Sequence, residues 1–145
     1  MSLTVLDDAR QRPRAFHWRG AVAAADLRAW LDGISYSVPD DLIELWKTVG
    51  GGDLFESEEV YAPDGTDDDL RVVTEDMSTR GLQAGFTVFH RGLWVSVLDH
   101  ATGELVVLNE PSLYEEEAYF TTFDDWYRLL PRAEFGERYG LMDPE

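Results

Sequence analysis

The fold class is decided by residues 86–109, which read FTVFHRGLWVSVLDHATGELVVLN. β-Branched and aromatic residues dominate this stretch, and its side chains alternate with a period of two, which is typical of strands. We expect one strand over 86–91 and a second over 93–99. The four residues that follow, His-Ala-Thr-Gly, fit a hairpin turn that returns the chain along 104–109. These antiparallel strands form the core of the predicted sheet.

Two helices are predicted before this sheet. Over 21–31 the apolar residues recur at intervals of three and four, and Gly33 provides a C-terminal stop. The second helix has Ser37 as its expected cap and Pro39 in its first turn, and the glycines at 50–52 end it.

The remaining segments are less regular. Residues 1–20 read as an irregular, arginine-rich arm with aromatic anchors. Short strands are expected at 54–55 and 60–62, followed by a turn at 63–66. The stretch from there to residue 76 fits either a loop or a short helix, for which the candidate caps are Thr66 and Asp67.

A last pair of helices is predicted after the sheet. Thr122 and Asp125 resemble a capping box, and Pro131 separates the helix behind them from a final short one. The order of elements therefore predicts an α+β fold: an antiparallel sheet with N-terminal and C-terminal helices packed on it.

Composition narrows the class of protein. The chain has 145 residues, which is the size of one domain, and its 18 aromatic residues exclude a disordered acidic tail. The absence of cysteine excludes disulfides, thiolate metal sites and a cysteine nucleophile. We see neither a signal peptide nor an apolar run that could cross a bilayer, so we expect a soluble, cytoplasmic protein that does not bind membranes.

The net charge of −17 is unevenly distributed. Residues 1–36 carry five arginines and four aspartates, so the rest of the chain holds the whole acidic excess. Ten carboxylates and one arginine lie between positions 53 and 76, and six carboxylates with no basic residue lie between 110 and 125. Such a field repels nucleic acid and attracts cationic proteins.

Catalytic and metal-binding motifs are missing from the sequence. The three histidines lack metal-ligand spacing, and no Gly-x-Ser-x-Gly elbow or phosphate loop is present. Residues 64–69 are rich in oxygen ligands but lack the spacing of an EF-hand. We therefore predict no catalytic residue, no metal and no cofactor. An enzyme that uses an acidic pair or a divalent cation is a remote alternative.

Two stretches carry a family resemblance. Residues 38–52, VPDDLIELWKTVGGG, resemble the Pro-x-x-Leu/Phe…Gly-Gly signature of the SMI1/KNR4 (SUKH) superfamily, in which a proline opens the second helix and a glycine pair closes it. Residues 120–130, FTTFDDWYRLL, are similar to the closing helix of that family. The resemblance spans residues 24–131 of a single domain covering 1–145, although the Asn of the family's Asn-Gly pair is missing here.

The resemblance implies an α+β binding domain without catalysis or cofactor. Bacterial members are widely immunity proteins that neutralise a polymorphic toxin encoded beside them, often a nuclease, whereas eukaryotic members act in cell-wall regulation. It thus implies a protein partner, a cationic toxin domain encoded nearby, and the acidic charge independently favours such a partner. The alternative is a regulatory or scaffold adaptor of the same fold with a different protein partner.

The residues expected to contact the partner come from the two acidic runs and the tyrosines beside them. They are Glu58, Glu59, Tyr61, Asp67, Asp68, Asp69, Tyr114, Glu115, Glu116, Glu117 and Tyr119.

Overall fold

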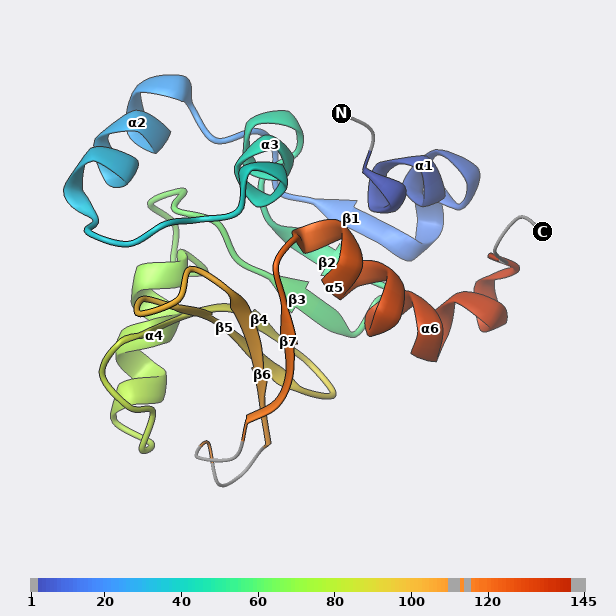
Figure 1. Cartoon of the computed structure of the whole chain (residues 1–145). Coiled ribbons are helices and arrows are strands. Elements are labelled where there is room, and N and C mark those ends of the chain that lie inside the picture. The colour runs from blue at the N-terminus through green and yellow to red at the C-terminus, as the bar shows by residue number, and fades with distance from the viewer. Residues whose placement is uncertain (1–2, 110–112, 114–115, 142–145) are drawn as a thin grey trace.

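A seven-stranded antiparallel sheet organises the molecule (Figure 1). The computed structural model describes residues 3–109, 113 and 116–141. The strands lie across the sheet in chain order, so each one pairs with its neighbours in sequence. Their bounds are β1 Phe16–Trp18, β2 Gly52–Leu54, β3 Glu58–Val60, β4 Phe86–Arg91, β5 Val95–Asp99, β6 Leu105–Leu108 and β7 Glu116–Phe120. The predicted α+β class is confirmed.

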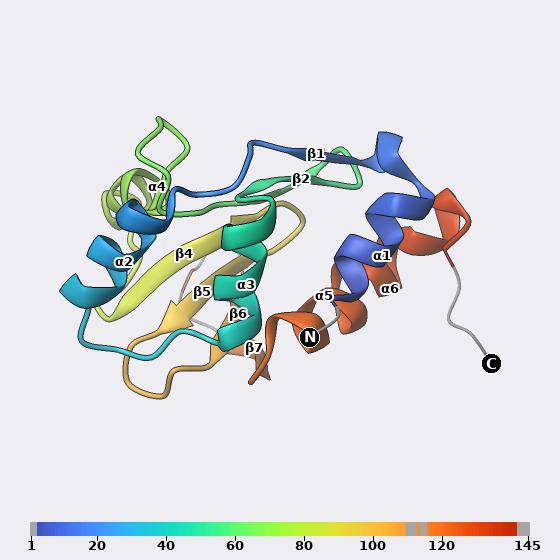
Figure 2. The same cartoon turned by 90° about the horizontal axis from the view of Figure 1, so that it is seen from above.

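Three of the helices form one group at one end of the molecule (Figures 1 and 2). The bounds of the helices are α1 Thr4–Gln11, η1 Pro13–Ala15, α2 Ala24–Gly33, α3 Asp40–Thr48, α4 Leu70–Ser78, α5 Phe123–Leu129, α6 Pro131–Phe135 and η2 Gly136–Tyr139, of which η1 and η2 are 3-10 helices. Helices α1, α5 and α6 lie together, away from α2 and α4 (Figures 1 and 2). We call residues 3–15 and 121–141 the helical end. Within the described ranges, no helix has the length and apolar character needed to cross a membrane.

The central strands confirm the predicted hairpins. Val97 of β5 pairs with Val88 of β4 on one side and with Val106 of β6 on the other. All four residues of β6 are buried. Because successive side chains of a strand point to opposite faces, this part of the sheet is covered on both faces.

The prediction of an irregular arm over residues 1–20 is wrong. Most of this segment forms α1 and β1, and β1 adds to the sheet with Phe16 opposite Leu54. No side chain next to α1 caps it; instead, the Thr4 amide donates to Asp124 Oδ1 at 2.8 Å. That partner lies 120 positions away, so no local pattern could reveal it.

The expected cap of the second helix is also wrong. Helix α3 starts at Asp40, Pro39 holds the N-cap position, and no side chain, that of Ser37 included, makes a cap hydrogen bond there. The helix before it covers 24–33 rather than 21–31. Its N-cap, Ala23, has no side chain able to accept a hydrogen bond, so the sequence carries no start signal.

Of the segment 66–76, for which we expect a loop or a short helix, residues from Leu70 on form a helix and residues 66–69 remain a loop. Helix α4 is capped by Asp69, whose side chain accepts from the Arg71 amide, rather than by Thr66 or Asp67. The two short strands before it begin two residues earlier than predicted, at Gly52 and Glu58. The turn between them takes positive φ angles at Phe55 (52°) and Glu56 (65°), which neither residue type signals.

The cap of α5 combines two sources. Thr122 accepts from the Asp125 amide at 3.1 Å, as predicted. The remaining amides of the first turn, those of Phe123 and Asp124, donate to the Asp41 carboxylate of α3, both at 2.8 Å. This carboxylate fixes where α5 stands on the sheet.

Buried polar contacts hold the helical end together. Asp8 of α1 is 2 % exposed and accepts from the Tyr127 hydroxyl at 2.5 Å and from Arg132 Nε at 2.8 Å. Burial, followed by the Asp8 hydrogen bond, raises the pKa of Tyr127, so this hydroxyl remains a donor. The Phe55 ring from the β2–β3 turn stacks on Tyr127 with 6.1 Å between ring centroids.

Candidate functional site

Carboxylates gather around the loop that joins β3 to α4. Those with at least partial exposure are Asp26, Glu59, Asp64, Asp67 and Asp68. We call this set the acidic surface. It combines side chains from α2, from β3 and from the loop itself, so the fold adds to the run that is visible in sequence.

Short-range hydrogen bonds fix the loop. Asp64 Oδ1 accepts from the amide of Thr66 at 3.0 Å and from its hydroxyl at 2.7 Å. Asp69 accepts from the amide of Gly65 at 2.6 Å and from that of Arg71 at 2.7 Å. Gly65 has a φ of +77°, a conformation that side-chain-bearing residues rarely adopt. The exposed aspartates of the loop therefore project from a constrained backbone.

Arg71 is an internal counter-ion of this loop. Its guanidinium binds Asp69 through two bonds, Nε to Oδ1 at 2.9 Å and Nη2 to Oδ2 at 2.7 Å. Burial opposes ionisation of Asp69, but the Arg71 side chain and the backbone donors outweigh it and lower the pKa of Asp69. Asp69 first, and then Asp64 and Asp26, raise the pKa of Arg71, which places these carboxylates within its field.

Arg19 bridges two members of the acidic surface. It follows β1 in sequence and reaches Glu59 at 3.5 Å and Asp68 at 3.7 Å. Its Nη1 also donates to the Val60 carbonyl at 3.0 Å, and its guanidinium lies 5.9 Å from the centroid of the Tyr61 ring. Arg19 therefore brings two predicted site residues to one place.

A hollow of about 310 Å³ opens between α2 and this loop. Its walls include Asp26 and Asp64 together with Trp30, and Arg71 lies at its side. Trp30 is only 8 % exposed, and its ring packs edge-on against Trp46 at 5.5 Å. A cationic side chain entering this hollow would meet the carboxylates of Asp26 and Asp64 and the Trp30 ring, with Arg71 also in the lining.

Three predicted contact residues lie inside the protein instead. Glu58 is 1 %, Asp69 1 % and Tyr61 4 % exposed, so these side chains support the surface without contributing to it. Burial, helped by the charge of Glu59, raises the pKa of Tyr61. Glu59, Asp67 and Asp68 remain as members of the acidic surface.

The second acidic run lies elsewhere. Glu116 and Glu117 belong to β7, as does Tyr119, which is 54 % exposed. Three strands separate β7 from β3, which at about 4.8 Å per step is roughly 19 Å. Tyr114 and Glu115 lie outside the described residues. The described part of the second run therefore does not join the acidic surface.

Sequence reasoning missed Asp26, Trp30, Arg19 and Arg71. One signal was available, because Asp26 and Trp30 stand four apart on a helix and so share one side of it. Their proximity to the loop could not be found, because it depends on how the α2–α3 unit packs against residues almost forty positions later.

A second cluster has the connectivity of a catalytic triad. His90 Nδ1 lies 2.8 Å from Ser96 Oγ, and its Nε2 lies 3.0 Å from Glu58 Oε1. Both His90 and Ser96 are 0 % exposed, and Trp126 Nε1 donates to Ser96 Oγ at 3.0 Å. A substrate cannot reach a hydroxyl in this position, so the cluster ties β3, β4, β5 and α5 together.

The charge state of this cluster follows from its surroundings. Burial lowers the pKa of His90 more than Glu58 raises it, so the ring is neutral at pH 7. Burial opposes ionisation of Glu58, but donors from His90, the Leu93 amide and Ser57 outweigh it and lower the pKa of Glu58. Glu58 is thus a buried carboxylate held by hydrogen bonds.

In the part of the chain that the structure describes, no three histidine, aspartate or glutamate side chains are arranged to hold a metal ion. A scan against protein-family models finds no match to this chain. A comparison with curated proteins finds no significant relative either.

Proposed function

We propose that this chain is a non-catalytic binding domain whose acidic surface captures a cationic protein. The resemblance of residues 38–52 and 120–130 to SMI1/KNR4 proteins extends this proposal to an immunity protein that neutralises a toxin by stoichiometric binding, a basic nuclease being the favoured target. The observation that carries the proposal is the gathering of five carboxylates from α2, β3 and the β3–α4 loop, two of which, Asp26 and Asp64, line a hollow.

The distribution of charge supports a cationic partner. Residues 17–120 contain six basic and 21 acidic residues, whereas the helical end contains six of each. The acidic excess therefore lies almost wholly on the part of the molecule that bears the acidic surface. A partner that must bind phosphate has the opposite charge and would be steered to this side.

The construction of the loop supports binding rather than mere solubility. The carboxylates of Asp64 and Asp69 accept hydrogen bonds from backbone amides of the loop. These bonds fix the backbone conformation of the segment that carries Asp67 and Asp68. A preorganised surface loses less conformational freedom when it binds than a mobile acidic run would. Arg19 and Arg71 neutralise part of the negative charge of the loop, which lowers the electrostatic repulsion between its closely spaced carboxylates.

Co-expression with the protein encoded immediately beside this chain tests the proposal. The complex should purify with one copy of each chain, and its association rate should fall steeply as salt is raised. The double variant Asp67→Asn/Asp68→Asn should associate about tenfold more slowly at low salt.

The matched control is Glu134→Gln/Glu137→Gln, which removes the same charge from exposed positions at the helical end. It should associate at nearly the parental rate. If both variants slow association equally, the acidic surface acts only through the net charge of the protein and is not the binding site. Binding that is insensitive to salt and to both variants would favour the adaptor alternative.

A further inference from the structure

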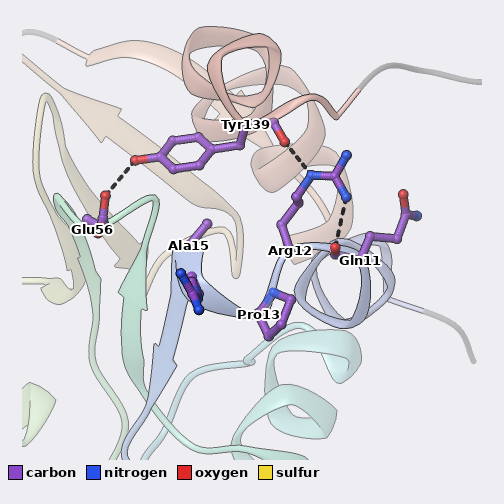
Figure 3. Close-up of a pocket in the computed structure, with 7 residues that line it drawn as sticks. Gln11, Arg12, Pro13, Ala15, Glu56 and Tyr139 are labelled. Carbon is purple, nitrogen blue, oxygen red and sulfur yellow. Dashed lines mark hydrogen bonds between the residues drawn. The ribbon is translucent and has the colours of Figure 1, made fainter.

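A second hollow lies where the helical end meets the β2–β3 turn, and it shares no lining residue with the hollow of the acidic surface. Its volume is about 330 Å³, and it opens between η1, η2 and the β2–β3 turn (Figure 3). Pro13 and Ala15 line it next to the ring of Tyr139, and Arg12, Arg14 and Glu56 also border it. It therefore joins an apolar interior to charged groups.

Arg12 is fixed at one side of this hollow. Its Nε donates to the Tyr139 carbonyl at 2.7 Å and its Nη1 to the Gln11 carbonyl at 2.9 Å (Figure 3). A guanidinium has five N–H groups, so three have no acceptor among the described residues. Both acceptors are neutral carbonyls, which leave the positive charge uncompensated.

Arg14 adds a second cation. It makes no hydrogen bond or ion pair with another residue in the described ranges, and it is exposed. By contrast, Arg10, Arg128 and Arg132 of the helical end each contact an aspartate. Arg138 forms no ion pair among the described residues either, but it lies over the Phe135 ring and does not line the hollow. Arg12 and Arg14 are therefore the two arginines that bring cationic groups without an ion-pair partner to this hollow.

The opposite side of the hollow is acidic. Glu56 Oε2 accepts from the Tyr139 hydroxyl at 3.0 Å, and Figure 3 shows Glu56 on one side and Arg12 on the other, with Ala15 between them. A ligand therefore meets positive charge on one side and negative charge on the other. This polarity defines the orientation in which a charged ligand can enter.

We propose that this hollow docks an acidic segment of a partner protein, in which one large apolar side chain stands next to a carboxylate. The carboxylate binds the remaining N–H groups of Arg12 and the guanidinium of Arg14, and the apolar side chain covers Pro13 and Ala15. Charge complementarity selects this occupant, because a cationic segment would meet two uncompensated arginines. The site is separate from the acidic surface and does not depend on the function proposed for it.

Two short peptides test the proposal: acetyl-Gly-Phe-Glu-Gly-amide, and the same peptide with Gln in place of Glu. Each is titrated into the full chain at millimolar concentration while the arginine Nε–H signals are followed by NMR. The Glu peptide should shift the Arg12 signal in a saturable way, and the Gln peptide should bind about tenfold more weakly.

Variants assign the contact. Arg14→Gln should weaken binding of the Glu peptide several-fold without changing Tm, because this side chain has no structural bond to lose. Arg28→Gln, an exposed arginine on α2, is the matched control and should bind as the parent does. Glu56→Gln should strengthen binding, because it removes the carboxylate that repels the ligand.

Equal binding of the two peptides, equal loss in Arg14→Gln and Arg28→Gln, or no shift of the Arg12 signal would each overturn the proposal. None of these outcomes bears on the acidic surface, because neither peptide carries a positive charge.

Discussion

The helical end and the rest of the molecule use carboxylates in different ways. The helical end contains six acidic residues and six arginines. Two of these carboxylates, those of Asp8 and Asp124, accept hydrogen bonds from hydroxyl, guanidinium or amide donors. In residues 17–120 acidic residues exceed basic ones by 15. A few of them, such as Glu58 and Asp69, are buried and hydrogen-bonded, whereas the members of the acidic surface are at least partly exposed.

The comparison teaches that charge alone does not identify an acidic residue's role. A buried carboxylate with several donors is costly to replace, because its removal leaves those donors buried without a partner. An exposed carboxylate in a surplus of like charge contributes little to stability and is available for a partner. The predictions that follow test this division, starting with the largest expected effect.

Asp8→Asn should be the most damaging change. It removes the carboxylate that both Tyr127 and Arg132 contact inside the helical end, so the free energy of unfolding should fall by about 3 kcal/mol. Urea unfolding measures this loss. Asp7→Asn changes the preceding aspartate, whose exposed pairing with Arg10 should be worth less than about 1 kcal/mol. Equal losses at the two positions would contradict the division.

Gly92→Ala tests the buried carboxylate outside the helical end. A Cβ at position 92 would come within 2.3 Å of the Glu58 carboxylate and displace it from His90 and the Leu93 amide. We expect a loss of about 2 kcal/mol in thermal or urea unfolding. Gly33→Ala is the control, since nothing lies within 4 Å of a Cβ there. If both variants unfold alike, Glu58 is not held as described.

The pH dependence of stability tests the neutral state of His90. Burial lowers its pKa below the ordinary value of 6.5, so the unfolded chain binds more protons than the folded one as pH falls through 6.5. Stability present above this pH is therefore lost on acidification, with a slope of about 1 kcal/mol per pH unit or less. His90→Asn should flatten the slope of unfolding free energy between pH 7 and 5.

His100 gives the comparison for that measurement. Burial, partly offset by Asp99, also lowers its pKa, and its ring is stacked on Tyr36 with 3.7 Å between centroids. Because His100 is only partly buried, His100→Asn should change the slope less than His90→Asn does. If His100→Asn changed the slope more than His90→Asn, protonation of His100 rather than of His90 would cause the pH dependence.

The smallest effect is expected at the acidic surface. Asp67→Asn/Asp68→Asn should alter the free energy of unfolding by less than about 0.5 kcal/mol, because the single weak bridge from Asp68 to Arg19 is lost while like-charge repulsion is relieved. Under the proposed function the variant should slow partner association, yet its urea midpoint should remain near that of the parent. A loss comparable with that of Asp8→Asn would mean that the loop depends on these exposed charges.

The fold was predictable wherever the evidence is local. The two-residue period of 86–109 predicts the central hairpins, and Thr122 predicts the start of α5. Helix α1 and strand β1 could not be predicted, because Thr4 and Phe16 find their partners at Asp124 and Leu54. A single residue with a distant partner leaves no pattern in its own neighbourhood.

The sequence predicts that an acidic site is present, but it does not predict which of the acidic side chains are exposed there. The run around Asp67 and Asp68 is visible in sequence, but nothing in it separates those two residues from Asp69, which turns inward to cap α4. The capping role depends on where the helix begins, and one residue of difference moves a carboxylate from solvent to 1 % exposure. The contribution of Asp26 depends on packing that no spacing encodes.

The carboxylate of Asp41 has a consequence for the order in which the chain can open. Helix α5 takes two of its first amide bonds from α3, and α1 takes one of its own from Asp124 in the first turn of α5. Helix α3 therefore supplies hydrogen-bond acceptors to the N-terminus of α5, and α5 supplies one to the N-terminus of α1. In terms of hydrogen exchange, the Thr4 and Phe123 amides should become accessible in the same opening event, and α1 should not detach while α3 and α5 remain docked.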